Sequence, residues 1–147
     1  MSVIILYSTR SRSTEKMANA IAEGASEKGV EVKVYSLRRY TFEDVVGDLE
    51  RAKAIVIGSP THNYKPAYEV EILLSKLEGL NVKGKLGAAF GSYGWSGEGA
   101  YEVQNKMKRL GFNMVSEPLT VVEEPNQEHL EKCRELGRVI AEKVAGS

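Results

Sequence analysis

The chain has 147 residues, of which 42% are hydrophobic and 27% are charged, the composition of a single soluble globular domain. Lysine and arginine together number 20, as do aspartate and glutamate, so no excess charge points to nucleic acid or to an anionic membrane. Cys133 is the only cysteine, which excludes an internal disulfide and an all-cysteine metal site. No signal peptide or membrane-spanning run is recognisable, so we expect a cytoplasmic protein.

Strand and helix patterns alternate along the chain. Short β-branched runs predict buried strands, and apolar residues at helical spacing predict helices. In chain order we expect a strand at 3–7, a helix at 13–28, a strand at 30–37, a helix at 41–49, a strand at 52–59, a helix at 67–78, a strand at 86–91 and a helix at 98–110. A fifth strand is expected to be split between 112–115 and 118–122, before a last helix at 130–144.

Five repeats of strand and helix predict an α/β fold with one parallel sheet and helices on both of its faces. Each right-handed crossover between parallel strands returns the chain through a helix, which then covers the sheet. Ligands of such folds bind outside the carboxyl ends of the strands, where the strand order switches. The loops that follow the first, third and fourth strands are therefore the candidate site.

The first of these loops, within "YSTRSRSTEKM" at 7–17, gathers hydroxyl side chains and two arginines in front of a helix. A helix N-terminus presents unpaired N–H groups and the positive end of its dipole, which favour a phosphate. The alternative is that Ser13 only caps the helix while Arg10 and Arg12 are solvated. Its place as the first strand-to-helix turn of the fold favours the phosphate.

The second loop, "GSPTHNYKPAY" at 58–68, combines aromatic side chains with amide groups. A flat heteroaromatic ligand needs both, a face to stack on and polar partners for its ring edge. His62 taken alone is more typical of a surface loop than of a catalytic base. With only two histidines and one cysteine in the chain, we expect no metal site of nitrogen and sulfur ligands.

The third loop, "FGSYGWSGEGAY" at 90–101, places four glycines around Tyr93 and Trp95, the only tryptophan. Glycines allow the backbone to approach a ligand closely. Trp95 is interpreted as a ligand contact, and the alternative is that it folds back over the edge of the sheet. One phosphate loop and two aromatic loops together indicate a mononucleotide with a flat ring system, for which FMN fits best. A dinucleotide and ATP are disfavoured, because neither GxGxxG nor GxxxxGK[ST] is present.

The full chain resembles the flavodoxin family, whose phosphate loop has the pattern T-x-T/S-G-x-T. Residues 9–14, "TRSRST", match it except that Arg12 replaces the glycine. The runs "STEKMANAIAEG", "IVIGSPTHN" and "FGSYGWSGE" resemble more closely the flavodoxin-like FMN module of flavodiiron proteins. The resemblance implies a flavodoxin-like three-layer sandwich with a five-stranded parallel sheet in the order 2-1-3-4-5.

The resemblance also implies the site residues. Those of the phosphate end are Thr9, Arg10, Ser11, Arg12, Ser13 and Thr14; those bordering the isoalloxazine ring are Pro60, Thr61, His62 and Asn63; and those of the opposite wall are Ser92, Tyr93, Gly94, Trp95 and Gly97. We assign no catalytic residue and no metal ligand. No histidine-rich diiron module precedes the first strand, so we expect residues 1–147 to form one standalone domain.

The expected function is electron transfer between redox partner proteins, such as a separate diiron or iron–sulfur protein, with no nucleic acid or membrane partner. One alternative is a small FMN-dependent NAD(P)H:quinone-type reductase. Another is a binding module that has lost its flavin. Because the chain has no net charge, electrostatic steering of a partner requires a local patch. The acidic stretches at 69–78 and 121–131 are candidates, although they are more typical of solvated faces.

Overall fold

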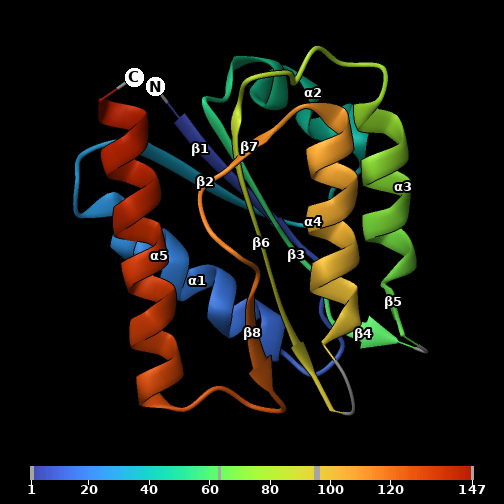
Figure 1. Ribbon diagram of the computed structural model, residues 1–147, viewed down its shortest axis with the longest axis vertical. Coiled ribbons are helices and arrows are strands. Elements are labelled where there is room, and N and C mark those ends of the chain that lie inside the picture. Colours follow the sequence, from blue (N-terminus) through green and yellow to red (C-terminus); the bar gives the residue numbers. More distant parts are fainter. Residues whose placement is uncertain (1, 63, 95–96, 147) are drawn as a thin grey trace.

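The computed structural model describes residues 2–62, 64–94 and 97–146, and only the backbone of His62. Strands and helices alternate as the sequence predicted (Figure 1). The elements are β1 (Ser2–Tyr7), α1 (Ser13–Ser26), β2 (Glu31–Ser36), α2 (Phe42–Arg51), β3 (Ala54–Gly58), β4 (Thr61–His62), β5 (Lys65–Pro66), α3 (Tyr68–Leu77), β6 (Leu86–Tyr93), α4 (Glu98–Leu110), β7 (Asn113–Met114), β8 (Leu119–Val122) and α5 (Gln127–Ala145).

The main sheet is parallel, in the order β2-β1-β3-β6, and both β7 and β8 pair with β6 at its edge. This confirms the predicted order 2-1-3-4-5, with the fifth position divided between two short strands. Pro118 lies between them and has no N–H to donate to the ladder. The split that the sequence pattern indicated therefore has a local cause.

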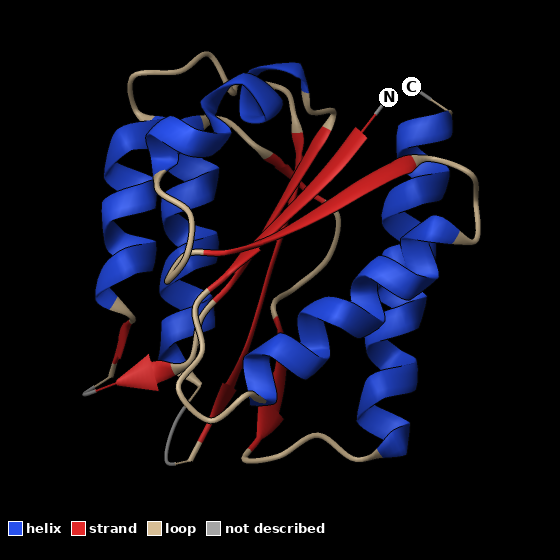
Figure 2. Cartoon of the chain, turned by 180° about the vertical axis from the view of Figure 1, so that it is seen from behind, coloured by secondary structure: helices blue, strands red, loops and turns tan. Residues whose placement is uncertain are grey.

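Helices cover both faces of the sheet (Figures 1 and 2). Alternate residues of β1 pack on opposite faces of the sheet, because successive side chains of a strand point to opposite sides. Val3 and Ile5 pack in one core cluster with residues of α1 and α5, whereas Ile4 and Leu6 pack in the other with residues of α2, α3 and α4. These are the three layers that the family resemblance implied.

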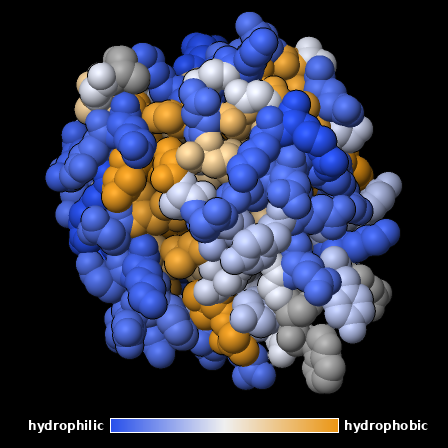
Figure 3. All heavy atoms as spheres, viewed as in Figure 1, coloured by the Kyte–Doolittle hydropathy of each residue, from blue (hydrophilic) through white to orange (hydrophobic). Residues whose placement is uncertain are grey.

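The surface seen in Figure 3 is hydrophilic over α4 and α5. Apolar side chains reach it between these helices, over the edge strands β7 and β8 (Figure 3). Val115, Leu119 and Leu130 are partly buried against the core on the α1 and α5 side of the sheet. Within the described ranges, no helix is long and apolar enough to cross a membrane.

A small hairpin in the second loop is absent from the sequence prediction. β4 and β5 pair antiparallel, with Thr61 opposite Pro66 and His62 opposite Lys65. Strands of two residues are too short to produce a periodic pattern, so only pairing in space reveals them. Thr41, by contrast, caps α2 as predicted: the Asp44 N–H donates to Thr41 Oγ1 at 3.3 Å, within a capping box.

Candidate functional site

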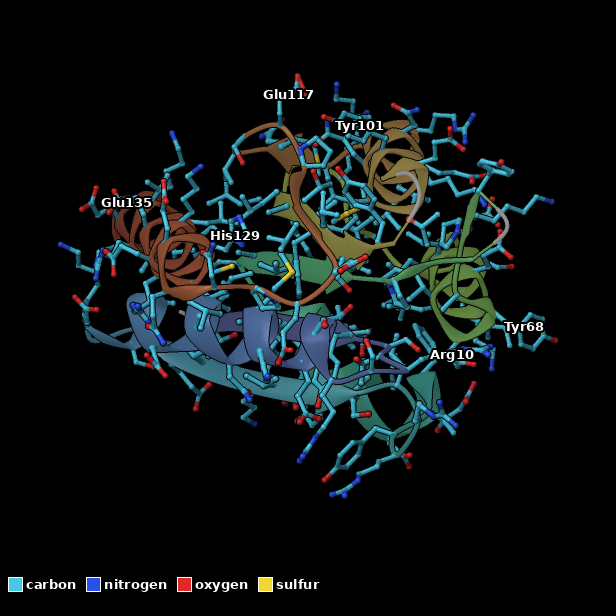
Figure 4. The ribbon with its side chains drawn as sticks, turned by 90° about the horizontal axis from the view of Figure 1, so that it is seen from below. Arg10, Tyr68, Tyr101, Glu117, His129 and Glu135 are labelled. Atoms are coloured by element: carbon cyan, nitrogen blue, oxygen red, sulfur yellow. The ribbon has the colours of Figure 1, made fainter. Side chains whose placement is uncertain are left out.

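The loops after β1, β3 and β6 lie side by side at the carboxyl edge of the sheet. The Ser8 N–H donates to Gly58 O at 3.1 Å, and the Ser59 N–H donates to Phe90 O at 3.0 Å. The strand order thus continues into the loops. Figure 4 views the molecule from this edge, with Arg10 on the same side as Tyr68 of α3 and across the molecule from Glu135 of α5.

A pocket of about 370 Å³ opens between these loops. Its volume lies in the range of small-molecule and cofactor sites. The predicted site residues that line it are Arg10, Ser11, Ser13, Pro60, Thr61, Ser92, Tyr93 and Gly94, and they come from all three loops. The structure therefore brings the three candidate loops together around one cavity.

Arg12 occupies an unusual position at the start of α1. It is the N-cap residue with φ 68°, in the left-handed region, and its side chain makes no capping hydrogen bond. The Arg12 side chain is 82% exposed, with Nε 3.7 Å from Glu15 Oε2. Ser13 is the first helical residue rather than the cap. The alternative in which Ser13 caps the helix is therefore wrong. Because no side chain caps α1, its first N–H groups are left available to a ligand.

Buried hydroxyl groups surround this helix start. Thr14 Oγ1 and Ser92 Oγ share a buried hydrogen bond of 3.0 Å, which joins the first and third loops. Thr9 Oγ1 is also buried, but it has no hydrogen-bond partner in the part of the chain that the structure describes. Buried polar atoms are rarely left unpaired. An unpaired hydroxyl in the loop that leads into a helix N-terminus fits a ligand that carries phosphate oxygens.

The second loop is held in place by two hydroxyl groups. Ser59, which is fully buried, donates through Oγ to Pro60 O at 2.8 Å and accepts from the Ala67 N–H at 2.8 Å. Thr61 Oγ1 accepts from the N–H of Gly99 in α4 at 3.0 Å. These bonds fix the loop between the hairpin and α4. Asn63 and the side chain of His62 lie outside the described residues.

The third loop approaches the second closely. A Cβ at Gly91 would lie 2.0 Å from Ser59 O, so only glycine allows this contact between the two loops. Around Gly94, by contrast, a Cβ would meet no atom of the described residues within 4 Å, its chain neighbours left aside. Gly97 is the N-cap of α4 and lies against the Tyr93 ring, while Trp95 falls outside the described residues. Tyr93 and Gly94 thus form the part of the pocket wall that the third loop contributes together with Ser92.

Two glutamates that the sequence analysis did not place in the site also line the pocket. Glu123 and Glu124 follow β8, and the Glu123 N–H donates to Tyr93 O at 2.6 Å. Glu124 accepts a hydrogen bond from Lys16, which lowers the pKa of its carboxyl group. The sequence did contain a signal that these two residues lie near the site. Both directly follow the predicted fifth strand, whose carboxyl end lies at the same edge of the sheet as the three loops.

The sequence was compared with models of known protein families, and the model described as flavodoxin matches residues 5–137. The chain belongs to the flavodoxin family. Flavodoxins bind FMN, so the cofactor inferred from the three loops is the cofactor of this family. The solved structure of a flavodoxin from the domain Archaea is 37% identical, with a TM-score of 0.90 and coverage of 99% of each chain.

Longer proteins contain a similar flavodoxin module. The nitric oxide reductase of Moorella thermoacetica is 39% identical over 143 residues, which cover 97% of this chain and 36% of that protein. The rubredoxin oxygen:oxidoreductase structure from Desulfovibrio gigas has a TM-score of 0.95 at 32% identity, covering 99% of this chain and 36% of the other. These homologues are flavodiiron proteins, as the sequence resemblance indicated, and the chain spans about a third of their length.

Proposed function

We propose that this flavodoxin module binds FMN in the pocket at the carboxyl edge and carries electrons between redox partner proteins. The observation that carries the proposal is the meeting, around one cavity, of an α1 N-terminus without a side-chain cap, the hydroxyls of Ser11 and Ser13, and a wall formed by Tyr93. The first two features suit a phosphate, and the third suits a planar ring.

The phosphate end is formed by residues 9–14. Thr9 Oγ1 and the N–H groups at the start of α1 would donate to phosphate oxygens, with the hydroxyls of Ser11 and Ser13 beside them. Arg10 lines the pocket and adds positive charge. Arg12 would contribute through its backbone, because its side chain is directed to solvent.

The ring end lies between the second and third loops. Pro60 and Thr61 line one side, and Ser92, Tyr93 and Gly94 line the other; we also assign His62, Asn63, Trp95 and Gly97 to this end from the family resemblance. Bound FMN supplies chemistry for accepting and donating one or two electrons. The chain's own groups would hold the ring, shield it from water and set the charge around it. Glu123 and Glu124 are the carboxylates among the pocket residues.

We propose an iron-containing redox protein as the partner class, either an iron–sulfur or a diiron protein. One relative is named a rubredoxin-oxygen oxidoreductase, at 33% identity over 139 residues, which supports a partner of this kind. The proposal includes residues 1–147 as one FMN-binding domain that acts in the cytoplasm.

Titration of the apoprotein with FMN, FAD and riboflavin tests the site. We expect FMN to bind far more tightly than riboflavin, because riboflavin lacks the phosphate that the first loop would hold. Equal affinity for the two would contradict the phosphate assignment. Steady reduction of a quinone by NAD(P)H with the FMN-loaded protein alone would contradict the carrier function and support a reductase.

A further inference from the structure

Arginines from two neighbouring loops form a basic surface beside the pocket. We define the arginine face as Arg10, Arg12, Arg38 and Arg39, all of which are exposed. β1 and β2 pair in register to their last residues, and the Leu37 N–H then donates to Tyr7 O at 2.8 Å. The residues that follow the two strands therefore lie side by side, and Arg38 Nη1 donates to Thr9 O at 3.5 Å.

The arginines of this face form fewer ion pairs with carboxylates than Arg138 of α5 does. Arg138 pairs with Glu27, Glu131 and Glu135 at 2.8–3.1 Å. Arg10, Arg38 and Arg39, by contrast, form no ion pair with any carboxylate of the described residues, and Arg12 makes only its 3.7 Å contact with Glu15.

Carboxylates on the flanking helices bind other groups. Glu15 of α1 accepts a hydrogen bond from the Tyr7 hydroxyl at 2.8 Å. Glu43 of α2 pairs with Lys76 at 2.7 Å, and Asp44 accepts from the Thr41 N–H at 2.8 Å. Glu69 of α3 accepts from Ser8. Of these four carboxylates only Glu43 is paired with a described cation outside the face, so Glu15, Asp44 and Glu69 keep their negative charge. The four arginines of the face outnumber these three carboxylates, on a chain whose formal net charge is zero.

We propose that the arginine face binds the acidic rim of a small redox protein and positions that protein's metal centre at the mouth of the pocket. This inference rests on the proposed electron-transfer function. Arg10 both belongs to the face and lines the pocket, so a protein docked on the face lies at the pocket rim. Guanidinium groups suit this contact because their planar donors match carboxylates.

The shape of the face favours a protein over a nucleotide phosphate. Arg38 and Arg39 stand on an exposed surface and do not line the site pocket, and Arg12 is 82% exposed. A small phosphate ligand is usually held in a concave site, whereas exposed charges spread over two loops steer a macromolecule to an interface. The sequence analysis considered the acidic stretches at 69–78 and 121–131 for electrostatic steering of a partner. We now propose the arginine face for this role instead.

The transfer would move one electron at each encounter from previously reduced FMN in the pocket to the iron centre of the docked protein, which would pass from Fe(III) to Fe(II). The test uses native cytochrome c, which is basic, and succinylated cytochrome c, in which the lysine amines are converted to acidic groups. Both carry the same haem. Dithionite reduces the FMN-loaded protein beforehand and is removed, so the reductant is defined.

We expect the reduced protein to transfer electrons faster to succinylated than to native cytochrome c at low ionic strength, with the advantage lost in 0.5 M salt. The double variant Arg38→Gln/Arg39→Gln should reduce the rate with the succinylated protein at least about fivefold and leave FMN affinity unchanged. Arg109→Gln is the matched control, because Arg109 also forms no ion pair among the described residues but lies near the end of α4, away from the pocket.

Binding of succinylated cytochrome c to the apoprotein, measured by calorimetry, separates this inference from FMN binding. A protein that fails to bind FMN but still binds the succinylated probe through Arg38 and Arg39 would refute the proposed function and support the face. Equal rates with both cytochromes, or no effect of the double variant, would overturn the inference. Saturable binding of NADPH but not NADH, lost in the double variant, would assign the face to a nucleotide phosphate instead.

Discussion

Replacing Arg12 with glycine should stabilise the protein. Arg12 has a φ of 68° at the N-cap of α1, a conformation in which an L side chain crowds the following carbonyl group. The family pattern has glycine at this place, and glycine adopts such a φ without strain. The left-handed backbone at this position explains why the family pattern has glycine there. It also shows that the surrounding loop holds Arg12 in an unfavourable conformation.

The size of the effect follows from opposing contributions. A non-glycine residue in this region costs about 1–2 kcal/mol, whereas glycine adds about 0.5–1 kcal/mol of conformational entropy to the unfolded chain. The ion pair with Glu15 contributes little, because Arg12 is 82% exposed and the two atoms lie 3.7 Å apart. We therefore expect a gain of about 0.5–1 kcal/mol in the free energy of unfolding, or a rise of about 1–4 °C in Tm.

Urea unfolding of the apoprotein, followed by circular dichroism, measures this gain. Arg12→Ala is the control, since it removes the guanidinium but keeps a side chain at the strained φ. Arg12→Gly should be more stable than both the parent and Arg12→Ala, and an Arg12→Gly protein no more stable than Arg12→Ala would refute the reasoning. Both variants should keep FMN affinity within about threefold, whereas a tenfold loss would show that the guanidinium grips the phosphate.

Four other outcomes are expected. Thr9→Val should lower FMN affinity about tenfold or more without lowering apoprotein stability, because its buried hydroxyl has no partner among the described residues; unchanged FMN titration would contradict this. Glu124→Gln should raise the reduction potential of bound FMN by on the order of tens of millivolts, since it removes a negative charge from the pocket lining; spectroelectrochemistry measures the shift, and a lower potential would count against it. Gly91→Ala should destabilise the protein by about 2 kcal/mol or more, because its Cβ would lie 2.0 Å from a carbonyl oxygen of the second loop. Gly94→Ala, where a Cβ meets no atom of the described residues within 4 Å, should cost far less in the same urea assay. Burial raises the pKa of the Cys133 thiol to about 12, so at pH 8 it should stay protonated and unreactive toward DTNB until the chain unfolds, and rapid labelling of the native protein would disprove its burial.

The order of the strands and helices was predictable because each element carries its own periodic pattern. Buried parallel strands are continuous apolar runs, and the helices repeat apolar residues at helical spacing. Even the divided fifth strand could be seen, since Pro118 interrupts it. The β4–β5 hairpin could not, because two-residue strands leave no pattern and exist only through their pairing.

The sequence by itself determined the fold class, the three site loops and the kind of ligand, since these depend on local patterns and on the edge at which parallel strands end. Only the tertiary structure decided which charges meet there. The sequence position of Glu123 and Glu124 after the fifth strand indicated only their edge of the sheet, and the pairing of β8 with β6 brings them to the pocket. In the same way, Arg38 comes to lie beside Thr9 because β2 pairs with β1. Such contacts join residues far apart in the chain, so no local pattern contains them.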